Sequence, residues 1–262
     1  MGRHFRLYAN FVRFSASRAM EFRFDFFFRV FMDLAYYGVA LGFFQLLYLH
    51  TDSVGGWNPH QARIFIAAYI LIDAIHMTIF SDNLWLLPGF VNKGDLDYYL
   101  VRPISPLFFL SLRSFAFNSF LNLIFAVGIA IWALSTYPEP LGVTRLAGFF
   151  LLLLVGGILY YCVHLLTILP VFWTQGGDSL HGLFYNVSRF MERPDRIYRG
   201  WARLVLTVLL PFGLMASFPT RLLIEPFNPA ILAQLLGVTA AFCGLTLWIW
   251  VRGLRAYGSA SS

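Results

Sequence analysis

Residues 92–108, NKGDLDYYLVRPISPLF, are a polar passage in a chain that is otherwise mostly apolar. The passage contains the only lysine of the protein, two aspartates, and the dipeptides Arg-Pro and Ser-Pro. Of all residues, 59% are hydrophobic and 12% charged, whereas a soluble domain carries about a quarter charged residues. This contrast places the chain among membrane proteins and makes the passage a connection between two membrane crossings.

The same passage is expected to form a short amphipathic helix with a defined start and end. Gly94 permits a sharp turn after the preceding helix, and Asp95 supplies a carboxylate near the next helix N-terminus. Arg102 and Pro103 end that helix, and Pro106 begins another. The helix should expose Asp97. The side chains that it should bury are Leu96, Tyr99 and Leu100.

The apolar runs on either side predict the fold class. A bilayer core of about 30 Å is crossed by about 20 mostly apolar residues in a helix, which satisfies its own backbone hydrogen bonds. Six runs qualify, so we expect an all-α integral membrane protein with one transmembrane domain over residues 1–262. The predicted spans lie near 27–49, 62–87, 107–135, 146–173, 202–223 and 230–251.

The basic residues predict the orientation of these spans. Lysine and arginine accumulate on the cytoplasmic side of membrane proteins. With both termini cytoplasmic, sixteen of the nineteen lysines and arginines fall inside and three outside. The net charge of +6 therefore reflects orientation, and no nucleic acid partner is expected. The predicted cytoplasmic segments are 1–29, 88–113, 174–203 and 252–262.

Residues 3–24 are expected to form an amphipathic helix in the plane of the lipid headgroups. At 100° per residue, Arg3, Arg6 and Arg13 fall in one stripe, and Phe5 and Tyr8 face the opposite way. The alternative is a basic tail.

The fifth predicted span is rich in proline. Pro211 is expected to bend it, because an interior proline removes a helical hydrogen bond. Residues 219–228 either turn back into the outer leaflet or lie along the headgroups. Arg221 and Glu225 are four residues apart and are placed to form an ion pair across one helical turn.

The sequence excludes one kind of chemistry and offers one polar candidate. A P-loop needs a lysine directly after a glycine, but Lys93 follows an asparagine, so this chain is not a P-loop ATPase by itself. Asp73 and His76 are expected on one face of the second span, and His164 lies in the fourth. Such groups at membrane depth indicate either a translocation pathway or a hydrogen-bonded packing pair between helices.

Other small motifs indicate packing. Cys162 and Cys243 lie in apolar runs and are expected to be reduced. Gly38 and Gly42 match the small-residue pattern of close helix packing.

Four passages together resemble the ABC-2 type transporter permeases, specifically a six-span bacterial branch. GDLDYYLVRPISPLF is similar to the first cytoplasmic loop of that branch, and VFWTQG matches the end of its fourth span. RPDRIYRGWARLVLTVLLPFGLMASFPTRLL resembles the fifth-span region, although the family more often has a proline directly after the tyrosine. WVRGLRAYGSASS resembles the C-terminal ending.

The resemblance implies a function. It implies a permease subunit of an exporter in the bacterial cytoplasmic membrane, paired with an identical or homologous permease and surrounded by membrane lipid. A separate P-loop ATPase would bind ATP and Mg, and residues 92–106 would be the coupling helix seated on it. Residues 3–24 would form the elbow helix, and the exported substrate stays unknown. The implied coupling interface comprises Gly94, Asp95, Leu96, Asp97, Tyr98, Leu100, Arg102 and Pro103.

Two other classes compete with this reading. An ion-coupled secondary transporter would use Asp73 and His76 as a proton relay, with His164 as a further polar group of the pathway. A membrane-embedded enzyme would need convergent polar groups, which the sequence does not offer.

Overall fold

The structure is a computed structural model that describes residues 7–13, 15, 23–174 and 176–258. Within them the chain is almost entirely helical, and only an isolated bridge between Val54 and Trp57 has strand geometry. In chain order the elements are α2 (Arg23–Tyr48), α3 (Pro59–His76), η1 (Met77–Ser81), α4 (Asp82–Lys93), α5 (Asp97–Leu100), α6 (Pro106–Leu112), α7 (Phe117–Ser135), α8 (Val143–Ile168), α9 (Val171–Thr174), α10 (Asp178–Ser188), η2 (Arg189–Glu192), η3 (Asp195–Ile197), α11 (Gly200–Leu204), η4 (Val205–Leu209), α12 (Phe212–Met215), α13 (Ser217–Ile224) and α14 (Pro229–Ala256).

Four helical stretches are long and apolar enough to cross a membrane: Phe26–Tyr48, Pro59–Lys93, Val143–Thr174 and Pro229–Ala256. The bent pair Gly200–Leu209 and Phe212–Ile224 makes a fifth if it counts as one span, and the apolar helix Ser119–Ser135 is shorter. These helices confirm an all-α membrane protein. The count of six stays a prediction, as do the cytoplasmic termini.

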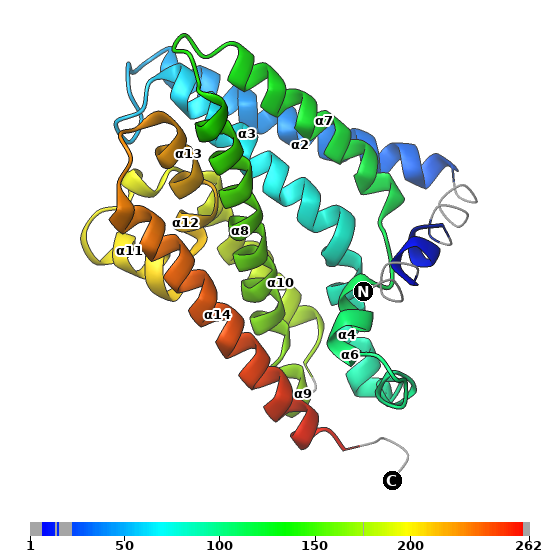
Figure 1. The fold of residues 1–262 in the computed structure, drawn as a ribbon. Helices are drawn as coiled ribbons and strands as arrows, with labels where there is room; N and C mark the ends of the chain where they lie inside the picture. The colour runs from blue at the N-terminus through cyan, green and yellow to red at the C-terminus, as the bar shows by residue number, and fades with distance from the viewer. Residues whose placement is uncertain (1–6, 14, 16–22, 175, 259–262) are drawn as a thin grey trace.

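Helix α3 lies at the centre of the molecule, with α2 and α7 on one side and α8 on another (Figure 1). Its sequence is apolar on nearly all faces, and most of its residues are buried, as expected for a core helix. The loops that follow α2 and α7 lie at one end of the molecule, and α4, α6, α9 and the end of α14 lie at the other (Figure 1).

The predicted third span, 107–135, is broken in the structure between α6 and α7. The buried amide of Asn83 occupies the break: its Oδ1 accepts from Ser114 N at 2.8 Å, and its Nδ2 donates to Ser114 O at 2.7 Å. Ala116 N donates to Thr78 O at 2.9 Å. One continuous helix was therefore the wrong expectation, because a side chain supplies the partners that helical backbone would otherwise need.

Residues 177–197 were predicted to belong to a cytoplasmic segment, but in the structure they pack beside α8 and pass parts of α4 and α3. At the start, a Cβ built on Gly177 lies 3.7 Å from Pro88 Cβ. His181 stacks on Trp85 with ring centroids 4.2 Å apart.

The later contacts of this segment lie progressively nearer the start of α3. Tyr185 OH is 3.3 Å from Ser81 Oγ of η1. Farther along, Glu192 Oε1 accepts at 2.6 Å from Tyr36 OH of α2, which lies 2.8 Å from Tyr69 OH of α3. Beyond η2, Arg196 Cβ is 3.4 Å from a Cβ built on Gly55, which lies in the loop between α2 and α3. The segment is thus antiparallel to α3 and α4 and ends at the opposite end of the molecule. The structure therefore separates the second half of this segment from the loop after α4, with which the charge-based prediction grouped it on one side of the membrane; which side each end occupies stays a prediction.

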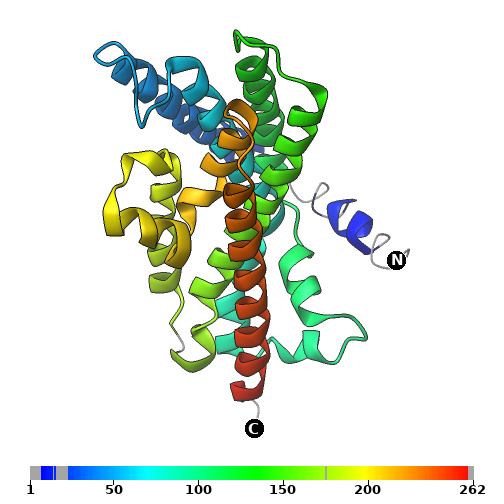
Figure 2. The same cartoon turned by 60° about the vertical axis from the view of Figure 1, so that its left-hand side comes forward.

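The predicted bend at Pro211 is confirmed. The two halves of the bent pair meet at 78° around Leu210 and Pro211. The chain segment that contains α11 stands out on one side of the molecule, drawn in yellow (Figure 2).

The N-terminal helix and the Gly38/Gly42 pattern were predicted to pack against the rest of the protein or the membrane. Residues 7–13 are helical, and the Phe11 ring contacts Phe109 with centroids 5.1 Å apart, but most of the predicted helix 3–24 lies outside the described residues. A Cβ built on Gly38 or Gly42 meets nothing within 4 Å, so that pattern makes no close contact with the part of the chain that the structure describes. The close approach occurs elsewhere, at Gly156, where an added Cβ would meet the Met215 carbonyl oxygen.

Candidate functional sites

The loop after α4 has the start that its sequence predicts. Gly94 adopts φ 79°, in the left-handed region that favours glycine, and its N–H points to Val91 O at 3.4 Å. Leu96 N donates to Phe90 O at 3.1 Å. The single-turn helix α5 follows.

The inner side of this loop is fixed to the helices above it. Leu96 is fully buried in a cluster with residues from α4, α6, α8, α9 and α14. The Arg113 guanidinium donates to Tyr99 OH and lies 4.4 Å from the centre of the Phe90 ring. Leu96 is therefore an anchor of the loop rather than a residue that a partner protein could touch. Its cluster partners are Leu84, Leu87, Val91, Leu110, Leu165, Ile168, Leu169, Val171, Phe172 and Trp250.

The outer side of the loop is apolar and exposed. Tyr98 is 70% exposed, Val101 83% and Leu100 36%, so the expected burial of Leu100 was wrong. Arg102 is exposed, donates to Tyr98 O at 3.2 Å, and lies 4.8 Å from the centre of the Phe109 ring. We call Tyr98, Leu100, Val101, Arg102 and Pro103 the loop face; apolar residues exposed in this way mark interaction surfaces.

The two aspartates of the loop are half-buried and lie near the end of α14. Burial raises the pKa of Tyr257, and the negative charges of Asp97 and then Asp95 raise it further. The structure thus brings the loop to the C-terminal end of the last helix, which separation in sequence does not indicate.

The structure brings the predicted polar residues Asp73, His76 and His164 together, but Asp73 and His76 have separate hydrogen-bond partners. His76 Nε2 lies 2.8 Å from His164 Nδ1, which joins α3 to α8. Asp73 Oδ1 instead accepts from Tyr160 OH at 3.4 Å. His164 also stacks on Phe184 of α10, with centroids 3.7 Å apart. This geometry matches the packing pair between helices, and Asp73 and His76 do not bond to each other.

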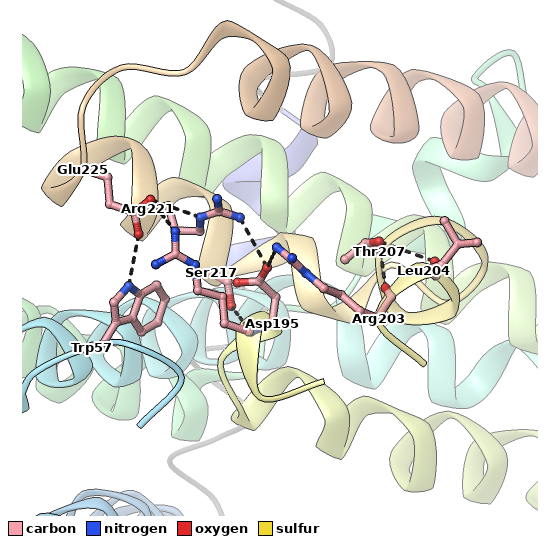
Figure 3. A network of polar contacts seen from close by, with 9 residues as sticks. Trp57, Asp195, Arg203, Leu204, Thr207, Ser217, Arg221 and Glu225 are labelled. Atoms are coloured by element: carbon pink, nitrogen blue, oxygen red, sulfur yellow. Dashed lines mark hydrogen bonds and ion pairs between the residues drawn. The ribbon is translucent and has the colours of Figure 1, made fainter. Parts of the chain in front are cut away.

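A buried charge network, which the sequence predicted only in part, lies at the other end of the molecule (Figure 3). Asp195 is fully buried, and its Oδ2 lies 2.8 Å from Arg203 and 3.3 Å from Arg221. Its backbone N donates to Ser217 Oγ at 3.1 Å. Asp195 therefore ties the loop after α10 to α11 and α13.

Glu225 extends this network to the loop between α2 and α3. The predicted pair with Arg221 is confirmed at 3.4 Å, and Arg196 is closer at 2.8 Å. Trp57 Nε1 also donates to Glu225 at 3.3 Å. The i,i+4 spacing revealed one of these contacts, and the others join residues too distant in sequence for any spacing rule.

Together, the apolar helices and buried polar contacts between them define a multi-pass membrane protein. Residues 34–261 match the model of the ABC-2 family transporter proteins, so the chain belongs to that family. Permeases of this family generally work with an ATPase subunit. Comparison with curated proteins gave no match, and neither did comparison with solved structures.

Proposed function

We propose that this chain is the permease subunit of an ATP-driven exporter in the bacterial cytoplasmic membrane. A separate P-loop ATPase binds ATP and Mg and rests against the loop face. A second permease chain, identical or homologous, completes the route through the membrane. Family membership supports the permease role, and the shape of the loop supports the site of coupling.

The observation that carries the coupling site is the contrast between the two sides of the loop. The loop face is exposed and mostly apolar, whereas Leu96 on the inner side is buried in a cluster with residues of α4, α6, α8, α9 and α14. Because packed interiors transmit displacement rather than absorb it, a partner that moves the loop face would move the ends of α4, α8 and α14.

The test uses two valines with almost equal exposure. Val101 lies on the loop face, and Val143, at the start of α8 near the opposite end, is 82% exposed. Each is changed to Asp in the tagged chain, which is expressed in its native cell, and the P-loop ATPase that the unaltered chain is expected to bring down is identified first. Val101→Asp should abolish co-purification of the ATPase and Mg-ATP hydrolysis by the complex, and Val143→Asp should leave both intact.

Equal effects of the two substitutions would contradict the coupling site. Transport by the purified chain without nucleotide would contradict the proposed function itself. The ion-coupled alternative has its own test: it requires that Asp73→Asn abolish transport, whereas an ATP-driven exporter should keep transporting with this variant.

A further inference from the structure

The segment of α10 and η2 presents basic and apolar side chains on its outer face. Arg189, Leu183, Asn186 and Phe190 are exposed. Steps of three and four residues place Leu183, Asn186 and Phe190 on one side of α10 and its continuation η2. Arg193 follows η2 in extended backbone and is exposed as well. Neither arginine forms an ion pair with a carboxylate among the described residues.

Arg189 lies far from both ends of the molecule. Tyr185, four residues earlier, contacts Ser81, and Glu192, three residues later, accepts from Tyr36, whose hydroxyl is 2.8 Å from Tyr69 OH. Arg189 therefore lies beside the part of α3 and η1 between residues 69 and 81, which is the middle of the continuous stretch Pro59–Lys93. A charged side chain at this depth is costly in lipid and normally faces a water-filled route or a partner.

The charge of this face limits what can cover it. Glu192, the nearest carboxylate in sequence, already accepts a hydrogen bond from Tyr36. A second copy that met this face with the same face would bring four arginines together, and like charges repel in a weakly screened environment. An anion between the arginines removes that repulsion. The apolar neighbours Leu183 and Phe190 favour an anion that carries a hydrocarbon or aromatic part.

We infer that Arg189 and Arg193 bind the anionic group of an amphipathic substrate on its way through the membrane. The guanidinium groups donate to the carboxylate, sulfate or phosphate oxygens, and the apolar part lies against Leu183 and Phe190. This inference rests on the proposed function, because it assumes that the face lines the export route.

The test compares two probes that differ only in charge: dodecanoate labelled with a nitrobenzoxadiazole fluorophore, and the same chain with a trimethylammonium group. Binding to the purified chain is measured by fluorescence titration without nucleotide. The unaltered chain should prefer the anionic probe. Arg189→Gln with Arg193→Gln should weaken anion binding by about tenfold or more, as expected for losing charge-assisted hydrogen bonds.

Matched variants separate this effect from general charge loss. Arg145→Gln removes an exposed arginine near the start of α8 and should leave binding unchanged. Arg189→Lys in the Arg193→Gln background should recover part of the affinity. Equal affinity for the two probes, or anion binding that the double substitution leaves intact, would overturn the inference.

Transport by the complex in vesicles distinguishes this inference from the proposed function. Charge-selective binding together with movement of the dodecanoate probe that requires Mg-ATP supports both. Charge-selective binding without any effect of Mg-ATP on transport supports the anion site and contradicts the ATP-driven exporter. If transport requires Mg-ATP, but its rate depends neither on the charge of the probe nor on the arginine substitutions, the anion site alone is overturned.

Discussion

The side chain of Asn83 forms hydrogen bonds that backbone groups usually form with each other. Between α6 and α7 the chain is not helical, and Ser114 would leave its N–H and C=O without backbone partners. Asn83 bonds to both groups and also donates to Ile79 O at 2.9 Å. A buried backbone group without a partner is destabilising, so this amide determines where the helix can break.

Replacing Asn83 with Ala should therefore destabilise the protein by about 1–3 kcal/mol for each polar group that it leaves unpaired. Unfolding in detergent, followed by circular dichroism, measures the change. Asn10→Ala is the control, because Asn10 is exposed. An Asn83→Ala protein as stable as the control would show that water or a shifted backbone replaces the amide.

Asp195 is the residue on which the charge network depends. One of its carboxylate oxygens serves two arginines, and the residue is fully buried. Asp195→Asn should destabilise the protein by about 1–3 kcal/mol, because it removes the carboxylate that Arg203 and Arg221 share, while Glu225 still compensates Arg221. Arg203→Gln should cost less, since the Arg203 side chain is 42% exposed and can be hydrated. The same unfolding experiment ranks the two, and the reverse order would contradict this account.

At the scale of elements, long apolar runs were predictable and irregular ones were not. The stretches that include α2, α8 and α14 follow from length and hydropathy, because few charged residues interrupt the apolar pattern within them. The segment 177–197 was assigned to one side of the membrane because Arg189, Glu192 and Arg193 made it resemble a loop. Its path to the opposite end of the molecule depends on contacts with α3 and α4, which a single-sequence window cannot contain.

A glycine near the end of α14 gives a prediction at this scale. A Cβ on Gly253 would overlap the Phe172 ring, so the close packing of α9 against α14 depends on the absence of a side chain at this residue. Gly253→Ala should destabilise the protein by about 1–3 kcal/mol through overpacking. Gly244→Ala, in the same helix with open space around it, should be neutral or slightly stabilising, because alanine favours helix. Thermal unfolding of both variants in detergent tests the difference, and equal shifts would contradict it.

At the scale of the whole molecule, the core consists of two apolar clusters. The larger surrounds α3, and the smaller holds Leu96 of the loop between α4 and α5. The sequence predicted the turn from the glycine at position 94, and the burial of Leu96 from the amphipathic pattern of residues 96–100. It could not predict the approach of Tyr257 to this loop or the contacts of Asp195, which depend on how distant helices pack.

The path of residues 177–197 makes a prediction about the two sides of the membrane. Ile197 is 40% exposed and lies beside Gly55, at the end of the molecule opposite Val101. The charge-based assignment would put Ile197 and Val101 on the same, cytoplasmic side. In the structure Ile197 instead belongs with the loop that contains Thr51, which is also exposed.

Single cysteines distinguish these two topologies. In a chain with Cys162→Ala and Cys243→Ala, cysteine is introduced at Thr51, Val101 or Ile197, and intact cells are treated with a membrane-impermeant maleimide. Thr51→Cys and Ile197→Cys should react before lysis, and Val101→Cys only after it, because the reagent cannot cross the bilayer. If Ile197→Cys reacts only after lysis, together with Val101→Cys, then residues 177–197 do not cross the membrane. In that case Arg189 lies outside the hydrophobic region, and the depth argument for an anion site fails with it.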